Sequence, residues 1–183
     1  MLDKIIAYHC APALVGIKPS NIVTCHKDKY PDIDKQIQEL NSKLNRKDIY
    51  IEVLCQCPKH SLLIVYRKEK LTKQLKDEGI SAFLKEYGYD ESGSLDDYLN
   101  KLRSNLHCDE FPHEIGAFLG YPLHDIYGFI NSKGKDCLCV GTWKVYGDVE
   151  NAKKTFARYK QCSEAIFNRV VRGQSLAQIF CAA

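Results

Sequence analysis

Two segments rich in branched and aromatic residues, separated by a short turn, constrain the fold of this chain most. Ile49–Leu54 and Leu62–Arg67 have the composition of β-strands, and Pro58-Lys59-His60 between them suits a hairpin. We therefore expect these two strands to pair antiparallel. Asn21–Cys25 and Cys137–Tyr146 have a similar composition and are predicted to be the third and fourth strands. The sequence thus predicts a small, mostly antiparallel sheet of about four strands.

Helical patterns fill much of the remaining chain. Apolar residues recur at the spacing of one helical face over residues 33–44. Ser94-Leu95-Asp96-Asp97 resembles a capping box and predicts a helix over about residues 94–107. Asp148 is a good N-cap for a long helix, which Gly173 ends, and Ser175 can cap a last short helix. A sheet covered by several such helices places the chain in the α+β class.

The composition limits what the chain binds and where it works. Its 183 residues suffice to bury a hydrophobic core, so we expect a single globular domain over residues 1–183. The 26 basic and 23 acidic residues are spread along the chain, unlike the basic stripe of a nucleic-acid-binding protein. No apolar run approaches the roughly 20 residues that cross a bilayer, and the N-terminus lacks a signal-peptide pattern. We therefore expect a cytoplasmic protein without nucleic-acid or membrane partners.

A reactive thiol is predicted near the N-terminus. Pro12 disfavours helical conformation at Ala11, so the first helix is expected to break near His9-Cys10 and a new one to start at Pro12. Cys10 would then lie just before a helix N-terminus. There the partial positive charge of the helix dipole favours the thiolate, which makes Cys10 the candidate nucleophile.

A candidate base lies in the segment from Glu110 to Pro122. This segment predicts a short apolar helix with His113 in its first turn, where the imidazole is favoured in its neutral, proton-accepting form. A neutral imidazole beside a thiol makes a base-activated nucleophile, and Glu114 or Asp125 could orient the ring. The predicted catalytic residues are Cys10, His113 and Glu114. The order of Cys and His resembles papain-like cysteine enzymes, and this resemblance implies a hydrolase or acyl-transfer reaction.

Ligand contacts and metal binding are the alternatives to catalysis. Cationic and aromatic side chains adjoin one another at several points, where they could meet an anionic small molecule. The predicted ligand-binding residues are His9, Lys18, Arg67, Tyr121, Trp143 and Lys144. The cysteine pairs Cys55/Cys57 and Cys137/Cys139 could supply metal ligands, but alternate cysteines on strands are typical of packing, so we expect these four sulfurs not to converge.

A family resemblance runs nearly from end to end. It is carried by His9-Cys10-Ala11-Pro12, Gly16-Ile17-Lys18, Leu63–Arg67, Phe111–Gly116, Phe118–Pro122, Gly128-Phe129-Ile130 and Trp143–Tyr146. Through these segments the chain resembles a bacterial family known as domain of unknown function 3793. The resemblance implies a redox or metal-related role, and with it a redox protein as partner, but it assigns no reaction and leaves the cofactor unknown. Three hypotheses therefore stay open: a Cys10-dependent enzyme, a non-catalytic metal- or cofactor-binding redox accessory protein, and an interaction module.

Overall fold

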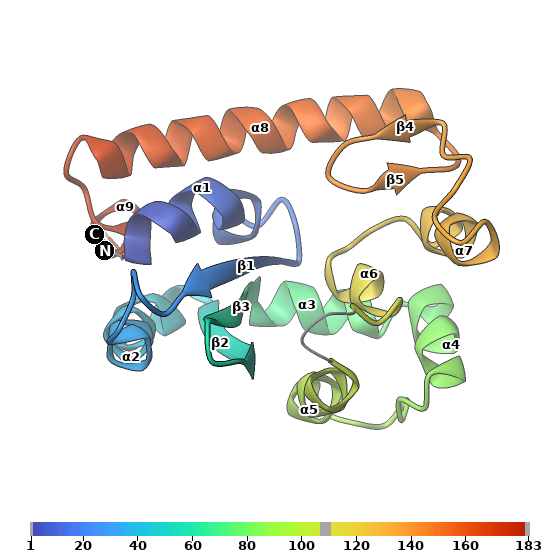
Figure 1. Cartoon of the computed structure of the whole chain (residues 1–183), viewed down its shortest axis with the longest axis horizontal. Helices are drawn as coiled ribbons and strands as arrows, with labels where there is room; N and C mark the ends of the chain where they lie inside the picture. The colour runs from blue at the N-terminus through green and yellow to red at the C-terminus, as the bar shows by residue number, and fades with distance from the viewer. Residues whose placement is uncertain (1, 107–110, 182–183) are drawn as a thin grey trace.

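A three-stranded antiparallel sheet organises the chain, which the computed structural model describes over residues 2–106 and 111–181 (Figure 1). The sheet order is β1-β3-β2, with strands β1 (Ser20–His26), β2 (Ile49–Gln56) and β3 (His60–Arg67). The predicted hairpin between β2 and β3 is confirmed, and Asn21–Cys25 lies in the third strand. The chain is α+β, as the sequence predicts.

The central strand β3 divides the core in two. Side chains alternate across a strand, so Leu62, Ile64 and Tyr66 face one hydrophobic cluster while Leu63 and Val65 face another. All five are buried. This burial on both faces explains the unbroken apolar run that marks the strand in the sequence.

Helices from both ends of the chain cover one face of the sheet. The helix α1 (Leu2–Leu14) packs on β1 and β3, and α8 (Val149–Val171) packs on α1. Figure 1 shows α1 lying between the sheet and the long α8. The helices α2 (Ile33–Leu44) and α9 (Leu176–Cys181) pack against each other at one end of this layer, and a short 3-10 turn, η1 (Asn45–Lys47), leads into β2.

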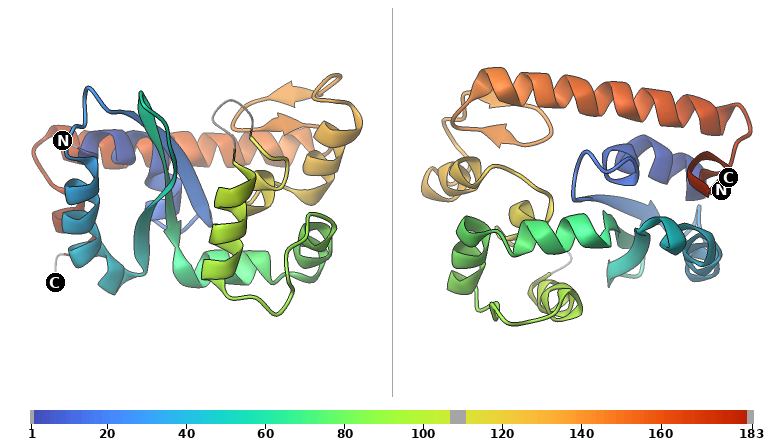
Figure 2. Two further views of the ribbon diagram at one scale, coloured as in Figure 1. Left: turned by 60° about the horizontal axis from the view of Figure 1, so that its bottom comes forward. Right: turned by 180° about the vertical axis from the view of Figure 1, so that it is seen from behind.

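The middle of the chain covers the opposite face. It forms α3 (Lys68–Leu75), α4 (Glu78–Glu86), α5 (Leu95–Asn105), α6 (Ile115–Phe118) and α7 (Leu123–Asn131). Figure 2 shows these helices gathered beyond one end of the sheet, beneath the N-terminal half of α8. Their apolar sides join the cluster that contains Leu62, Ile64 and Tyr66.

The segment predicted as a fourth strand forms a separate hairpin instead. Its strands β4 (Cys139–Val140) and β5 (Lys144–Val145) pair with each other, so the prediction of a four-stranded sheet is wrong in this detail. Trp143 and Val145 pack with Ala152 of α8 in a third, small hydrophobic cluster. The hairpin therefore packs against α8 and α7 rather than extending the sheet.

The predicted break at His9-Cys10 is wrong. The helix α1 continues through Cys10 and Pro12 to Leu14. Proline removes one backbone donor, and here it does so in the last turns of the helix, where the loss is small compared with the apolar burial of the inward face. Leu2, Ile6, Cys10 and Leu14 all lie on that buried face. Cys10 is thus a mid-helix residue and receives no stabilisation from a helix N-terminus.

The capped helices follow the sequence closely. Ser94 and Asp97 form the predicted capping box, Asp148 caps α8 through the backbone N–H of Asn151, and Gly173 follows α8 with φ +97°. The helices α3, α4 and α7 are not among the sequence-based predictions. Among the described residues, no helix combines the length and the apolar character that crossing a bilayer requires.

Candidate functional site

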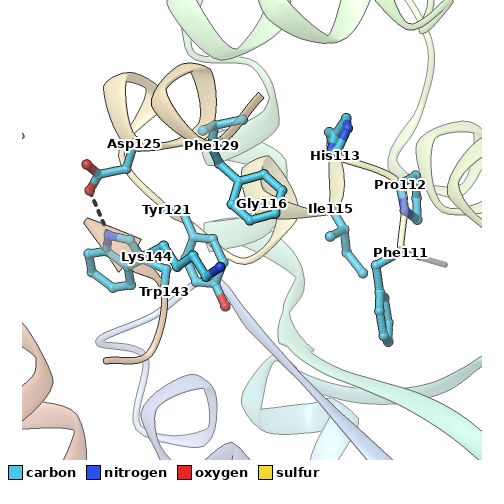
Figure 3. Close-up of a pocket in the computed structure, with 11 residues that line it drawn as sticks. Phe111, Pro112, His113, Ile115, Gly116, Tyr121, Asp125, Phe129, Trp143 and Lys144 are labelled. Carbon is cyan, nitrogen blue, oxygen red and sulfur yellow. Dashed lines mark hydrogen bonds between the residues drawn. The ribbon is translucent and has the colours of Figure 1, made fainter. Parts of the chain in front are cut away.

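An apolar pocket of about 230 Å³ lies between α6, α7 and the β4–β5 hairpin. Aromatic rings form much of its wall, supplemented by Ile115, Gly116 and Ile126; the rings belong to Phe111, Tyr121, Phe129 and Trp143. Figure 3 shows the ring of Phe129 descending from α7 toward Tyr121 and Ile115. Phe111 and Phe129 are partly exposed, at 56% and 36%, so the pocket opens to solvent beside them.

The turn before α7 fixes the position of Tyr121. Gly120 has φ +67°, and a Cβ at this position would lie 2.6 Å from Cδ of Pro19. Only glycine therefore allows the chain to turn this close to the segment that precedes β1. The Tyr121 hydroxyl donates to the Thr142 carbonyl at 3.1 Å, and its ring lies 5.1 Å from that of Trp143. Both rings are held in place without a ligand.

Asp125 is the structural link between α7 and the hairpin. Its carboxylate accepts from Trp143 Nε1 at 2.7 Å and from the backbone N–H groups of Tyr146 and Gly147 at 2.7 and 3.0 Å. The side chain is buried, and the dashed line in Figure 3 marks its bond to Trp143. Asp125 lines the pocket, but both of its oxygens are already engaged by donors.

Two basic side chains stand at the edge of the pocket. The Lys144 ammonium donates to the Gly134 carbonyl at 2.8 Å and lies 5.7 Å from the centroid of the Phe129 ring. The His113 ring meets the edge of the same phenyl ring, with centroids 5.7 Å apart. Apart from the occupied Asp125, no carboxylate lines the pocket among the described residues. Lys144 is therefore a cation beside a lining in which the carboxylate of Asp125 is already engaged.

A buried ammonium lies behind the pocket. Lys18 is only 2% exposed, and its Nζ lies 5.2 Å from the ring centroid of Tyr121 and 5.9 Å from that of Tyr159. Burial lowers the pKa of Lys18 to about 8, an effect that the neighbouring Cys10 thiol opposes. Cation–π contacts with the two rings compensate part of the lost hydration. Lys18 adds a positive charge on the side of Tyr121 away from solvent.

Cys10 is a core thiol. It is fully buried in the cluster that contains Leu63 and Val65, and burial raises the pKa of its thiol far above the ordinary range. His113 instead lines the apolar pocket. Across residues 2–106 and 111–181, no hydrogen bond joins the two side chains. The structure therefore does not assemble the predicted thiol and base into a pair.

The residues expected to orient His113 have other partners. Glu114 is buried and accepts from Asn105 Nδ2 at 2.7 Å, with the Tyr89 hydroxyl at 3.5 Å. Asp125 holds Trp143 and the hairpin. The helix α6 begins only at Ile115, so the prediction that His113 lies in its first turn is wrong.

Of the predicted ligand-binding residues, Tyr121, Trp143 and Lys144 come together at the pocket and Lys18 adjoins them. His9 lies elsewhere, in a groove between α1 and α8. The Arg67 guanidinium donates to the carbonyls of Leu14 and Lys47, which completes the C-terminal end of α1.

Phe111, Ile126 and Phe129 also line the pocket but are not among the predicted site residues, although Phe111 begins the segment from Phe111 to Pro122 that was predicted to border a functional cleft. Ile126 and Phe129 lie three positions apart in a segment rich in apolar residues, which is the spacing of one helical face. This spacing predicts an apolar helical face, but it does not distinguish a face that lines a pocket from one that packs in a core.

No metal site is evident in the part of the chain that the structure describes, since no three His, Cys, Asp or Glu side chains gather there as ligands would. Cys55 belongs to β2 and Cys139 to β4, and these strands are in different sheets. The two cysteine pairs therefore lie on separate elements of the fold.

Comparison with known proteins places the chain in a family. The family described as "Protein of unknown function (DUF3793)" matches residues 6–180, nearly the whole length. No curated protein and no solved structure matches the chain. The matched region includes α1, the sheet, the aromatic pocket and α8. The chain belongs to the DUF3793 family.

Proposed function

We propose that this protein binds a small planar aromatic anion in the pocket between α6, α7 and the β4–β5 hairpin. One observation carries the proposal: aromatic walls surround a preformed space at which Lys144 and His113 stand, while Asp125, the carboxylate that lines it, is fully engaged. Ligand sites are typically concave, mostly apolar and furnished with a few polar groups.

The aromatic walls favour a flat ligand. Tyr121, Trp143 and Phe129 present ring faces and edges, against which an aromatic ring gains stacking and edge contacts of about 1 kcal/mol each beyond its area burial. A volume of about 230 Å³ suits a ligand of one ring rather than a nucleotide or a large cofactor.

The charges favour a ligand with a carboxylate or a similar group. Lys144 uses one N–H on Gly134 and keeps donors for a ligand at the pocket edge. Lys18, behind Tyr121, adds to the positive potential at this point. A ligand cation would meet repulsion from both ammonium groups.

The proposal is a binding function in the cytoplasm. Nine cysteines in one chain suit a reducing compartment. A binding role also agrees with a Cys10 that is enclosed by apolar side chains and cannot reach a substrate.

Isothermal titration calorimetry with benzoate tests the proposal. Benzoate is expected to bind with a Kd of about 1 mM or tighter, since a small, rigid ligand can gain several tenths of a kcal/mol per atom. Benzamide has the same shape without the charge and should bind about fivefold more weakly. Lys144→Gln should weaken benzoate binding by a similar factor and leave benzamide binding unchanged.

Lys153→Gln is the matched control, because Lys153 is an exposed lysine of α8 outside the pocket. It should bind benzoate as the unaltered protein does. The proposal fails if benzoate shows no saturable heat at several millimolar, or if benzamide and benzoate bind equally well to all three proteins.

A further inference from the structure

A thiol and an imidazole meet at the turn between β2 and β3, at the end of the sheet. Cys57 Sγ lies 3.2 Å from His60 Nδ1, which is hydrogen-bonding distance for sulfur. The turn itself enforces the contact, because the Cys57 N–H donates to the His60 carbonyl at 2.9 Å and the His60 N–H points to Cys57 Sγ at 3.4 Å. In the sequence these residues are Cys57-Pro58-Lys59-His60.

Lysine, histidine and aspartate residues adjoin this pair. The Lys27 N–H donates to the Lys59 carbonyl, so two lysines adjoin the turn. His26 lies directly opposite His60 in the β1–β3 register, with ring centroids 6.4 Å apart. Asp34 is the nearby carboxylate on α2, and it accepts from the side chain of Gln56 at 3.4 Å.

Four other described thiols are in different environments. Cys10 and Cys25 are fully buried, and burial raises the pKa of both. Cys181 Sγ donates to the Lys43 carbonyl at 3.3 Å, and Cys139 Sγ approaches the Val140 carbonyl at 3.9 Å. Cys57 is half-buried at a turn whose neighbours Gln56 and Lys59 are exposed, so a small reagent can reach its sulfur.

We propose that Cys57 is a site of covalent modification by soft electrophiles, hydroperoxides included, with His60 as the base that takes the thiol proton. In the reaction with a hydroperoxide, Sγ attacks the terminal peroxide oxygen and the O–O bond breaks. The proton held at His60 Nδ1 then passes to the departing alkoxide. The products are a sulfenic acid on Cys57 and an alcohol, or water when the oxidant is hydrogen peroxide.

Alkylation kinetics on the folded protein test the role of the base. In the reaction with iodoacetamide the S–C bond forms, iodide leaves and the thiol proton goes to His60. At neutral pH, peptide mapping should show Cys57 alkylated at least about tenfold faster than Cys139, a half-buried thiol that no imidazole of the described residues contacts. This ratio is measured on the unaltered protein and so does not depend on whether a variant folds.

Variants separate the chemistry from a structural role. His60→Gln should slow the alkylation of Cys57 about tenfold and leave the alkylation rate of Cys139 unchanged. His26→Gln, which replaces the neighbouring ring, should change the alkylation rate of Cys57 by less than about twofold. With hydrogen peroxide, dimedone should trap a sulfenic acid on Cys57 of the unaltered protein and far less of it in His60→Gln. The proposal would be overturned if Cys57 were alkylated no faster than Cys139, or if His60→Gln left the alkylation rate of Cys57 unchanged. It would also be overturned if hydrogen peroxide produced no sulfenic acid on Cys57.

Discussion

At the scale of single residues, Lys18 is a charged side chain that the fold buries at a cost in free energy. Its ammonium is almost completely buried, and its described neighbours are the two tyrosine rings and the Cys10 thiol rather than a carboxylate. Removing a charge from water costs several kcal/mol unless it is paired, and cation–π contacts return only part of that. The pKa of Lys18 is lowered to about 8 because the lost hydration of the ammonium is only partly compensated.

Lys18→Met is therefore expected to stabilise the protein at neutral pH. Below pH 8 the folded and unfolded states both hold the proton, and the cost of burying the charge is constant. Between about pH 8 and 10.5 the unfolded state binds more protons than the folded state, so the stability of the unaltered protein rises with pH. The advantage of the Met variant is up to about 3 kcal/mol near pH 7 and shrinks through this window.

Urea unfolding of both proteins at pH 7 and pH 10 measures this advantage. The ionisable groups that both proteins share contribute equally to the pH dependence of the two unfolding free energies, so their contribution cancels when one free energy is subtracted from the other. A difference that stays constant or grows with pH would show that Lys18 does not carry a depressed pKa.

At the scale of elements, Asp125 joins α7 to the hairpin that carries Trp143 and Lys144. Three N–H groups from the hairpin and the residues that follow it converge on one carboxylate. The strands β4 and β5 have only two residues each, too few to be stable without such support. The wall of the pocket therefore depends on a carboxylate whose oxygens accept from the hairpin.

Asp125→Asn is expected to destabilise the protein by about 3 kcal/mol. The amide turns one acceptor into a donor that faces existing N–H groups, and hydrogen bonds to a charged group contribute about 1.5–3 kcal/mol each. Denaturant unfolding followed by the fluorescence of Trp143, the single tryptophan of the chain, measures the change. Asp136→Asn, at an exposed position near the same hairpin, is the control and should be neutral. Equal stability of both variants would exclude this role for Asp125.

The sequence predicts best those elements whose signals are local. Ser94 with Asp97, and Asp148, place helix starts correctly because capping depends on residues within one turn. The break at Pro12 and the fourth strand fail because tertiary packing decides them. The burial of Ile6, Cys10 and Leu14 keeps α1 helical past Pro12. The hydrogen bond that Trp143 donates to Asp125 holds this residue against α7, away from the sheet.

In the candidate site too, local signals predict residues correctly and long-range contacts are not predicted. Tyr121, Trp143 and Lys144 were predicted as ligand residues and do gather at one pocket, since cations beside aromatic residues are visible in the sequence. The pairing of Cys10 with His113 rests on a long-range contact. Sequence spacing contains no information on whether two distant residues share a face, and the structure buries Cys10 in another cluster.

At the scale of the whole molecule, the pocket lies where two hydrophobic clusters meet. Tyr121 packs against both the cluster of α3 to α7 and the small cluster of the hairpin with α8. The helix α8, 23 residues long, runs from that small cluster to the one beneath α1. A ligand that contacts Tyr121 and Trp143 would therefore add contacts between these two clusters.

Benzoate is accordingly expected to stabilise the folded protein as a whole. At a free concentration of about ten times Kd, binding to the folded state alone adds about 1.4 kcal/mol to the free energy of unfolding. Thermal unfolding with increasing benzoate measures the shift, with the same concentrations of sodium chloride as the control for ionic strength. A shift reproduced by the salt alone would rule out a specific site.

The position of the bound ligand tests the central claim most directly. In two-dimensional ¹⁵N NMR spectra the single tryptophan gives one indole N–H resonance, which reports on the Trp143 wall of the pocket. Titration with benzoate should shift this resonance and the backbone amide resonances of residues 115–129 along one saturable curve. Lys144→Gln should move the midpoint of that curve to a higher benzoate concentration. If benzoate leaves the indole resonance unmoved, or if the largest shifts lie outside these residues, the pocket is not the binding site.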